Sequence, residues 1–446
     1  MLPSYAMLRD RLGEMIDDKE RQGRETDGLS SRLADVPDDY EQLARLGREI
    51  DDLPMRTDWP YIEPDDLPSI KATWSWDGVT VECAVDLEAV EAKAYAGFLG
   101  RVCGCVLGKP VEIHATLATL REAFERVGEW PIVDYISERV YTKGGLERLH
   151  RSWPESVRER LTYVPPDDDI HYTLIGLQLL ERHGVDFTQN DIAEVWINQL
   201  PLRWTFGPER ATLVKLGLSM LGAYPQALDA SALAESLNPG EELCGAMIRA
   251  DAYGYACPGR PELAAELAWR DASLTHRRTG VYGSMFAAAA IASAFVVDDP
   301  LEVFGLALGF VPRESRFHRI VADSLDEVTA ASSWEDGYER VHGKYAEYTH
   351  CTVFQETGTL INTMRFAESV GHGIGLQVMQ GNDTDSYGAT AGSLLGIRFG
   401  SDGLDRRWLD PFQNTIRTQL AGFHDYDLDA LAHRVSRLVH VAGVAT

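Results

Sequence analysis

Apolar residues recur at helical spacing over most of this chain, from residue 86 to its last residues. The segment 284–297 is small and apolar on every side, which predicts a buried helix. Thr188, with Asp191 three residues later, resembles a capping box and predicts a helix start at that point. Further helical segments are expected at 301–310, 316–332 and 426–439. We therefore predict one compact, multi-helix, all-α domain over residues 86–446.

The first 85 residues follow a different pattern, and we expect them to form an N-terminal extension. Residues 1–50 are rich in Asp, Glu and Arg, with Leu or Met at loose helical spacing, which predicts one or two amphipathic helices. Four prolines between residues 51 and 70 predict an extended linker. Asp77 and Gly78, between two runs rich in Trp, Val and Thr, then predict a β-hairpin over residues 72–83.

Composition narrows the classes of function. The chain has 69 acidic and 42 basic residues, which gives a formal net charge of −27. Such a charge repels phosphate backbones and anionic lipids, so we expect neither general nucleic-acid binding nor docking on a membrane. No run of about 18 apolar residues predicts a transmembrane helix, and the first residues lack the apolar core of a signal peptide. Six cysteines without a C-x-x-C pair indicate reduced thiols in a cytoplasmic protein.

A stripe of glycines marks one helix. Gly97, Gly100, Gly104 and Gly108 are three, four and four residues apart, which places them on one face. Each glycine costs a helix about 1 kcal/mol relative to alanine. The sequence leaves two explanations open: tight packing against another backbone, or close approach of a ligand.

Three consecutive carboxylates, those of Asp167, Asp168 and Asp169, precede the apolar segment 174–184. Aspartates at a helix N-terminus cap the helix and suit its dipole, which explains one or two of them. Three in a row repel one another unless a cation neutralises them. The segment is therefore a candidate metal site as well as a helix start.

A second acidic cluster, formed by Asp383, Asp385 and Ser386, precedes a run of small residues. Two carboxylates and a hydroxyl within a short turn are donors that Mg²⁺ or Ca²⁺ prefers. One cluster alone cannot complete about six oxygen ligands. We therefore expect both clusters to meet at one site that holds one or two metal ions.

Three motifs occur in a fixed order: G-x-x-x-G-C-x-L-G-K-P-x-E at residues 100–112, the acidic triplet at 167–169 and G-N-D-T-D-S at 381–386. With these motifs the chain resembles the ADP-ribosylglycohydrolase family over about residues 92–440, and the segment 265–295 looks like a bacterial branch of it. The resemblance implies an all-α fold around a dinuclear Mg²⁺ site, with Mn²⁺ or Ca²⁺ as substitutes.

Carried over position by position, the resemblance implies six metal ligands: Asp167, Asp168, Asp169, Asp383, Asp385 and Ser386. In one register Asp167 stands where the family usually has Ser or Thr. A slip of one residue would make Asp167 and Asp168 the carboxylate pair. Glu112 is the candidate for gating or proton transfer, and Asp169 and Asp385 are alternative proton-transfer groups.

Substrate contacts are expected from residues close to these motifs and from the segment after residue 275. They are Gly108, His276, Tyr282, Gly283 and Asn382. Arg277 and Arg278 either contact a diphosphate or form a solvated pair. Cys105 stands where many family members have Asp, which removes one carboxylate from the expected cleft.

The sequence thus predicts a Mg²⁺-dependent hydrolase that cleaves an N- or O-glycosidic bond of an ADP-ribosyl or related ribosyl substrate. Its partner is a ribosyl-containing small molecule or an ADP-ribosylated macromolecule. Two alternatives stay open: a glycosidase or nucleoside hydrolase acting on a small furanoside, and a non-catalytic, metal-stabilised binding protein. The N-terminal extension is a candidate to shape or cover the substrate entrance, and the sequence does not define an oligomeric state.

Overall fold

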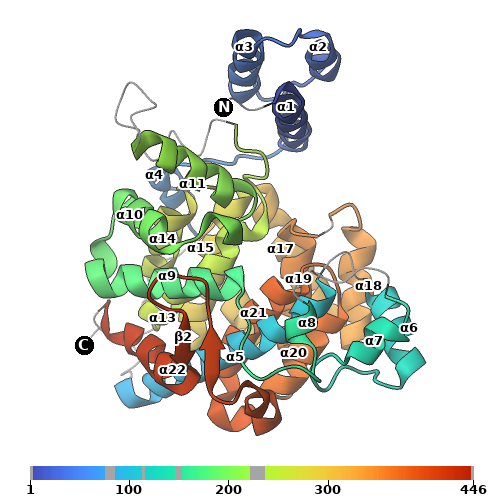
Figure 1. Cartoon of the computed structure of the whole chain (residues 1–446), viewed down its shortest axis with the longest axis vertical. Coiled ribbons are helices and arrows are strands. Elements are labelled where there is room, and N and C mark those ends of the chain that lie inside the picture. Colours follow the sequence, from blue (N-terminus) through green and yellow to red (C-terminus); the bar gives the residue numbers. More distant parts are fainter. Residues whose placement is uncertain are drawn as a thin grey trace.

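Helices make up most of the computed structural model, which describes residues 4–75, 86–112, 116–146, 153–220, 237–348 and 350–442. The predicted all-α fold is confirmed. Three N-terminal helices stand together at one end of the molecule, and the other helices pack into a large bundle (Figure 1). Within these ranges, no helix combines the length and apolar character that crossing a lipid bilayer requires.

The N-terminal unit has three helices around a small apolar core of its own. They are α1 (Tyr5–Arg21), α2 (Leu29–Asp35) and α3 (Tyr40–Asp51). The sequence predicted one or two helices here, so that prediction is wrong: the structure has three. The break between α2 and α3 comes where Val36 is extended ahead of Pro37, because a residue before proline disfavours the helical conformation.

An irregular segment joins this unit to the bundle and ends at α4 (Leu67–Lys71), so the predicted linker stops a few residues earlier than expected. The Asp66 side chain caps α4 by accepting from the Ser69 N–H at 2.9 Å. The predicted hairpin over 72–83 lies mostly outside the described residues. Its described part, 72–75, begins with a turn that follows α4.

Buried polar contacts fix the N-terminal unit to the bundle. The Lys19 ammonium pairs with Glu241 Oε1 at 2.8 Å, and both side chains are largely buried. The Gly240 N–H donates to Asp18 Oδ2 at 2.6 Å. The unit therefore rests on the segment around residue 240.

The linker makes further contacts with the start of the helix that follows Arg278. The Arg278 N–H donates to Asp65 Oδ1 at 2.7 Å, and the Tyr282 hydroxyl donates to the Pro64 carbonyl at 2.5 Å. The extension is thus bound to the bundle at several places, which include the segment around residue 240 and the start of this helix.

Two helices pack together more closely than any other pair described. They are α5 (Leu87–Gly108) and α21 (Thr384–Phe399). A Cβ at Gly104 would meet the carbonyl of Gly388, so the glycine stripe serves backbone-to-backbone packing. The two helices are antiparallel, and the Thr384 hydroxyl donates to the Gly108 carbonyl at 2.8 Å. The C-terminal end of α5 therefore lies beside the N-terminal end of α21.

The predicted buried helix is present as α15 (Thr279–Ala294), and every residue of it is buried. Its neighbours in the bundle include α21 as well as α13 (Asp251–Ala256), α14 (Pro261–Ala272), α16 (Pro300–Leu308) and α17 (Arg316–Ala330). The predicted capping box is also confirmed: Thr188 and Asp191 bond reciprocally at the start of α10 (Gln189–Gln199).

Other helices complete the bundle around this centre. Among the described residues, the remaining α-helices are α6 (Leu117–Val127), α7 (Glu138–Thr142), α8 (Trp153–Ser156), α9 (Asp168–His183), α11 (Gly207–Met220), α18 (Trp334–Lys344), α19 (Phe354–Phe366), α20 (Val370–Met379) and α22 (Leu428–Ser436). The 3-10 helices are η1 (Lys109–Val111), η2 (Gly184–Asp186), η3 (Leu202–Trp204), η4 (Cys244–Arg249), η5 (Ser401–Gly403), η6 (Arg406–Trp408), η7 (Asp410–Phe412) and η8 (Arg437–His440).

A small antiparallel sheet is an unpredicted feature. β1 (Thr415–Arg417) pairs with β2 (Asp425–Asp427), and Ile416 lies opposite Tyr426. The prediction of a helix from residue 426 is wrong for its first two residues, which belong to β2. Strands of three residues are too short to give an alternating signal in the sequence.

Candidate active site

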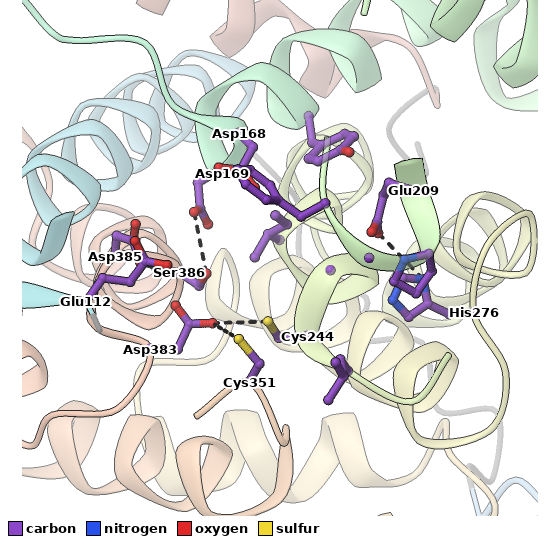
Figure 2. A pocket seen from close by; sticks show the side chains of 17 residues that line it. Glu112, Asp168, Asp169, Glu209, Cys244, His276, Cys351, Asp383, Asp385 and Ser386 are labelled. Carbon is purple, nitrogen blue, oxygen red and sulfur yellow. Dashed lines mark hydrogen bonds and ion pairs between the residues drawn. The ribbon is translucent and has the colours of Figure 1, made fainter. Parts of the chain in front are cut away.

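Three helix ends bring the two acidic clusters together. α5 continues through η1 to Glu112, α9 presents Asp169 from its first turn, and α21 presents Asp385 from its first turn. The Ser386 hydroxyl donates to Asp169 Oδ2 at 3.4 Å, which joins the second cluster to the first (Figure 2). The packing of α5 against α21 thus positions the second cluster next to Glu112.

These side chains line a cavity of about 160 Å³. Carboxylates and Ser386 form one end of it, and Glu209 and His276 form the other (Figure 2). The lining residues are Glu112, Asp168, Asp169, Tyr172, Phe206, Gly207, Pro208, Glu209, Leu243, Cys244, Gly245, Ile248, His276, Cys351, Asp383, Asp385 and Ser386.

Negative charge is concentrated at the carboxylate end. Glu112, Asp383 and Asp385 each place an oxygen within 4.8 Å of the others. Burial raises the pKa of Glu112, Asp169 and Asp383 well above the usual carboxylate range, and the nearby charge of Asp385 raises each further. The charged forms of these groups therefore need a cation beside them.

Two buried basic side chains neutralise part of this charge. Lys109 pairs with Asp167 and lies 3.7 Å from Asp385 Oδ2. Arg101 pairs with Asp251 at 2.8 Å and approaches Asp169 Oδ1 at 3.8 Å. Burial opposes the charge of Lys109, yet Asp385 and Glu112 raise its pKa above the usual value. The lysine is therefore a fixed positive charge behind the cluster.

The donor set fits a hard divalent cation. Six lining residues from the predicted set offer side-chain oxygens: Glu112, Asp168, Asp169, Asp383, Asp385 and Ser386. Among the described residues, Asp169 Oδ1 and Asp383 Oδ1 are buried and accept no hydrogen bond. A buried carboxylate oxygen without a donor is costly, and coordination to a cation removes that cost.

Asp167 has a different position from the two aspartates after it. Its side chain caps α9 by accepting from the Asp169 N–H at 2.9 Å, and it pairs with Lys109. Asp168 and Asp169 line the cavity, whereas Asp167 does not. The geometry thus favours the register in which Asp167 replaces the family's Ser or Thr. In the second cluster Asp383 makes no capping bond with its side chain, so helix capping does not explain it.

Several predicted substrate contacts lie away from the cavity. Gly108 packs against the backbone of α21, and the Tyr282 hydroxyl is bound to the linker. Gly283 faces Val353, while Asn382 donates to Gln355 Oε1 at 2.5 Å. His276 alone of the five predicted contacts lines the cavity.

Arg277 and Arg278 are buried rather than solvated. Arg277 donates to the backbone carbonyls of Ser273 and His276 at 2.7 and 2.8 Å. Arg278 lies 4.0 Å from the Glu242 carboxylate. Neither arginine lines the cavity.

The far end of the cavity contains a glutamate that the sequence did not single out. Glu209, in the first turn of α11, accepts from Arg249 Nη1 at 2.8 Å and lies 3.7 Å from His276 Nδ1. Burial raises the pKa of Glu209 to about 7. Burial and the charge of Arg249 lower the pKa of His276, whose Nε2 has no partner among the described residues. No motif in the sequence marks Glu209, which follows Gly207 and Pro208 at the start of α11.

Cysteines also line the cavity without having been predicted there. Cys244 and Cys351 are far apart in the sequence, and no spacing motif connects them. The Glu356 carboxylate accepts from the N–H groups of Cys351 and Asp383 at 3.2 and 2.9 Å, which holds both residues in place. Cys105 is buried behind the cluster, and burial raises the pKa of its thiol well above the usual value.

Together, the helical bundle and the cavity define an all-α protein with the donor set of a hard-cation site. A family model described as ADP-ribosylglycohydrolase matches residues 86–444. The chain therefore belongs to the ADP-ribosylglycohydrolase family, as its motifs indicate, and this membership points to a hydrolase of glycosidic bonds.

Comparison with solved structures supports the same fold. A structure described as an "ADP-ribosylglycohydrolase-related protein complex" is 18% identical in sequence, with a TM-score of 0.50. The match covers 79% of this chain and 99% of that chain. No curated protein matches this sequence.

Proposed function

We propose that this protein hydrolyses an N- or O-glycosidic bond of an ADP-ribosyl or related ribosyl substrate, with Mg²⁺ as its cofactor. One observation carries the proposal: six oxygen-bearing side chains converge on a cavity, and two of their buried oxygens accept no hydrogen bond among the described residues. Family membership supplies the class of bond that is cleaved.

Asp168, Asp169, Asp383, Asp385 and Ser386 would hold the cation, and two ions are expected. When bound, Mg²⁺ would supply Lewis-acid activation of a water and anchorage for ribose hydroxyls. Mn²⁺ or Ca²⁺ would substitute with similar oxygen ligands.

The protein's own groups account for the remaining steps. Glu112, at the edge of the cluster, is the candidate to take a proton from the attacking water, and Asp169 and Asp385 are alternatives. The surrounding carboxylates favour the positive charge that develops on the ribosyl ring in an oxocarbenium-like transition state. Lys109 holds Asp167 and Asp385 in place from behind.

The size of the cavity favours a second candidate substrate class. Pockets for drug-sized ligands usually enclose about 300–1,000 Å³, which exceeds the 160 Å³ found here. The cavity suits a ribosyl group, with the rest of a larger ligand outside it. A small furanoside without a protein target fits the same space.

The test is an assay of metal-stripped protein against ADP-ribosylated peptides and small ribosides, with and without added Mg²⁺. We expect hydrolysis that depends on Mg²⁺. Turnover confined to small ribosides would support the second candidate. Tight binding of Mg²⁺ and of a ribosyl ligand without turnover of any substrate would contradict hydrolysis and favour the binding-protein alternative.

A further inference from the structure

Two thiols lie against one of the acidic side chains on the cavity wall. The Cys244 Sγ is 3.0 Å from Asp383 Oδ2, and the Cys351 Sγ is 3.5 Å from the same oxygen (Figure 2). The Cys244 N–H also donates to the Cys351 carbonyl at 3.0 Å, so the two backbones are in contact. The proposed hydrolysis uses neither thiol.

The spacing of these three donor atoms suits a tetrahedral metal ion. All three lie within 4.8 Å of one another. Zinc binds sulfur at about 2.3 Å and carboxylate oxygen at about 2.0–2.2 Å, which puts neighbouring tetrahedral ligands roughly 3.5–3.8 Å apart. The observed distances therefore need only small side-chain shifts to become those of a zinc site.

The chemistry of the three donors differs from that of the oxygen cluster. Thiolate ligands select zinc and other thiophilic metals, whereas Mg²⁺ and Ca²⁺ prefer oxygen. All three donor residues line the cavity, through which water or a ligand can approach the site as a fourth donor. The Glu356 carboxylate holds two of these three residues in place, because it accepts hydrogen bonds from the backbone N–H groups of Cys351 and Asp383.

We propose that Cys244, Cys351 and Asp383 form a binding site for a thiophilic divalent cation such as Zn²⁺, beside the oxygen cluster. On binding, each thiol gives its proton to the buffer and each sulfur forms one bond to the metal. Asp383 belongs to both donor sets, so Zn²⁺ competes with the hard cation for it. That consequence rests on the proposed function, whereas the site itself does not.

The experiment measures metal binding without any substrate. The full chain, reduced and stripped of metal, is titrated with Co²⁺ in excess Mg²⁺, and the thiolate-to-cobalt charge-transfer absorption is recorded. We expect this band in the wild type and its loss in Cys244→Ser and Cys351→Ser. Changes in residues that only hydrogen-bond to metal ligands weaken metal binding by about 10–100-fold, so removing a direct ligand should weaken Co²⁺ binding at least about 10-fold.

Cys257→Ser is the matched control, because Cys257 is a buried free thiol that does not line the cavity. This variant should keep the band. A wild type without the band, or cysteine variants that retain it, would overturn the site.

A second measurement uses the wild type alone and so does not depend on the folding of a variant. Zn²⁺ should protect both Cys244 and Cys351 from alkylation, as mapped by peptide mass spectrometry. Equal labelling with and without Zn²⁺ would overturn the proposal. Both readouts stay decisive even if no hydrolysed substrate is found, so failure of the proposed function is recognised separately.

Discussion

At the scale of single residues, the cavity separates groups that are close in the sequence. Asp167 and Asp168 are consecutive, yet one caps a helix and pairs with Lys109 while the other lines the cavity. The Asp383 side chain does not cap α21, and one of its oxygens accepts no hydrogen bond among the described residues. Local position therefore decides which carboxylates are available to a cation.

Asp383→Asn and Asp385→Asn should each lower Mg²⁺ affinity and abolish hydrolysis, with little loss of helix content. An amide keeps the size of the carboxylate but removes the charge that a hard cation needs. Calorimetry with Mg²⁺ and far-UV circular dichroism check the two effects. Asp402→Asn, on an exposed 3-10 helix, is the control and should match the wild type. Unchanged Mg²⁺ binding in both cavity variants would refute the assignment.

Glu112→Gln separates catalysis from metal binding. If Glu112 handles the proton of the attacking water, the variant should lose about 10²–10⁴ in turnover while at least one metal ion still binds. Turnover and metal content are measured on the same preparation. A fall in turnover of less than about threefold corresponds to less than roughly 1 kcal/mol in the activation barrier. That result would show that Glu112 has only a structural role in the turn after η1. Loss of both metals would make it an obligatory ligand.

At the scale of elements, the contact between α5 and α21 sets the geometry of the cavity. Backbone meets backbone along the glycine stripe, so the helices lie closer than side chains would allow. Glu112 follows the end of α5, and Asp383 and Asp385 flank the start of α21. A change in the separation of these helices would therefore move the carboxylates apart.

Gly104→Ala should destabilise the protein and weaken Mg²⁺ binding together. The new Cβ would meet the carbonyl of Gly388, and overpacking costs about 1–3 kcal/mol. Gly305→Ala is the matched control in α16, where an added Cβ meets nothing within 4 Å. That control should gain up to about 1 kcal/mol from helix propensity. Denaturant unfolding measures both, and a Gly104→Ala protein as stable as the control would contradict the packing role.

At the scale of the whole molecule, charged side chains are buried at the junction between the N-terminal unit and the bundle. Lys19 and Glu241 pair across the junction, and Asp51 at the end of α3 lies near both. Burial raises the pKa of Asp51 from 3.8 to about 7, although Lys19 lowers it in part. One oxygen of Asp51 is buried without a partner among the described residues.

Asp51 should make the protein less stable as the pH rises from about 4 to about 7. In this range the unfolded chain has lost the Asp51 proton while the folded protein keeps it, so the folded state binds more protons and the free energy of unfolding falls with pH. Asp51→Asn stays neutral and should reduce this fall, as measured by denaturant unfolding at about pH 5 and about pH 8. Asp402→Asn, on the exposed 3-10 helix η5, should behave like the wild type.

Much of the fold was predictable because its signals are local. The capping box at Thr188 and the all-apolar run of α15 each occupy one segment, and both are found as expected. The two acidic clusters were found for the same reason. β1 and β2 were not predicted, because strands of three residues are too short to show an alternating pattern.

The rest of the cavity wall depends on tertiary packing. Glu209, Cys244 and Cys351 come from three separate segments, and no spacing rule connects them. Conversely, Tyr282 and Gly283 belong to a segment that resembled the family, but the structure turns them toward the linker and toward Val353. Sequence motifs located the charged end of the cavity, whereas the opposite end required the fold.

The junction between extension and bundle also bears on what counts as an autonomous folding unit. The family match begins at residue 86, yet Glu241, Arg278 and Tyr282 within the matched region each have a partner before that boundary. A fragment that begins at residue 86 would leave the Glu241 carboxylate without Lys19 and would remove Ile70 from the apolar core of the bundle. Newly exposed apolar surface favours aggregation. The boundary of homology and the boundary of foldability therefore differ in this chain, and expression of residues 86–446 should yield less soluble protein than the full chain.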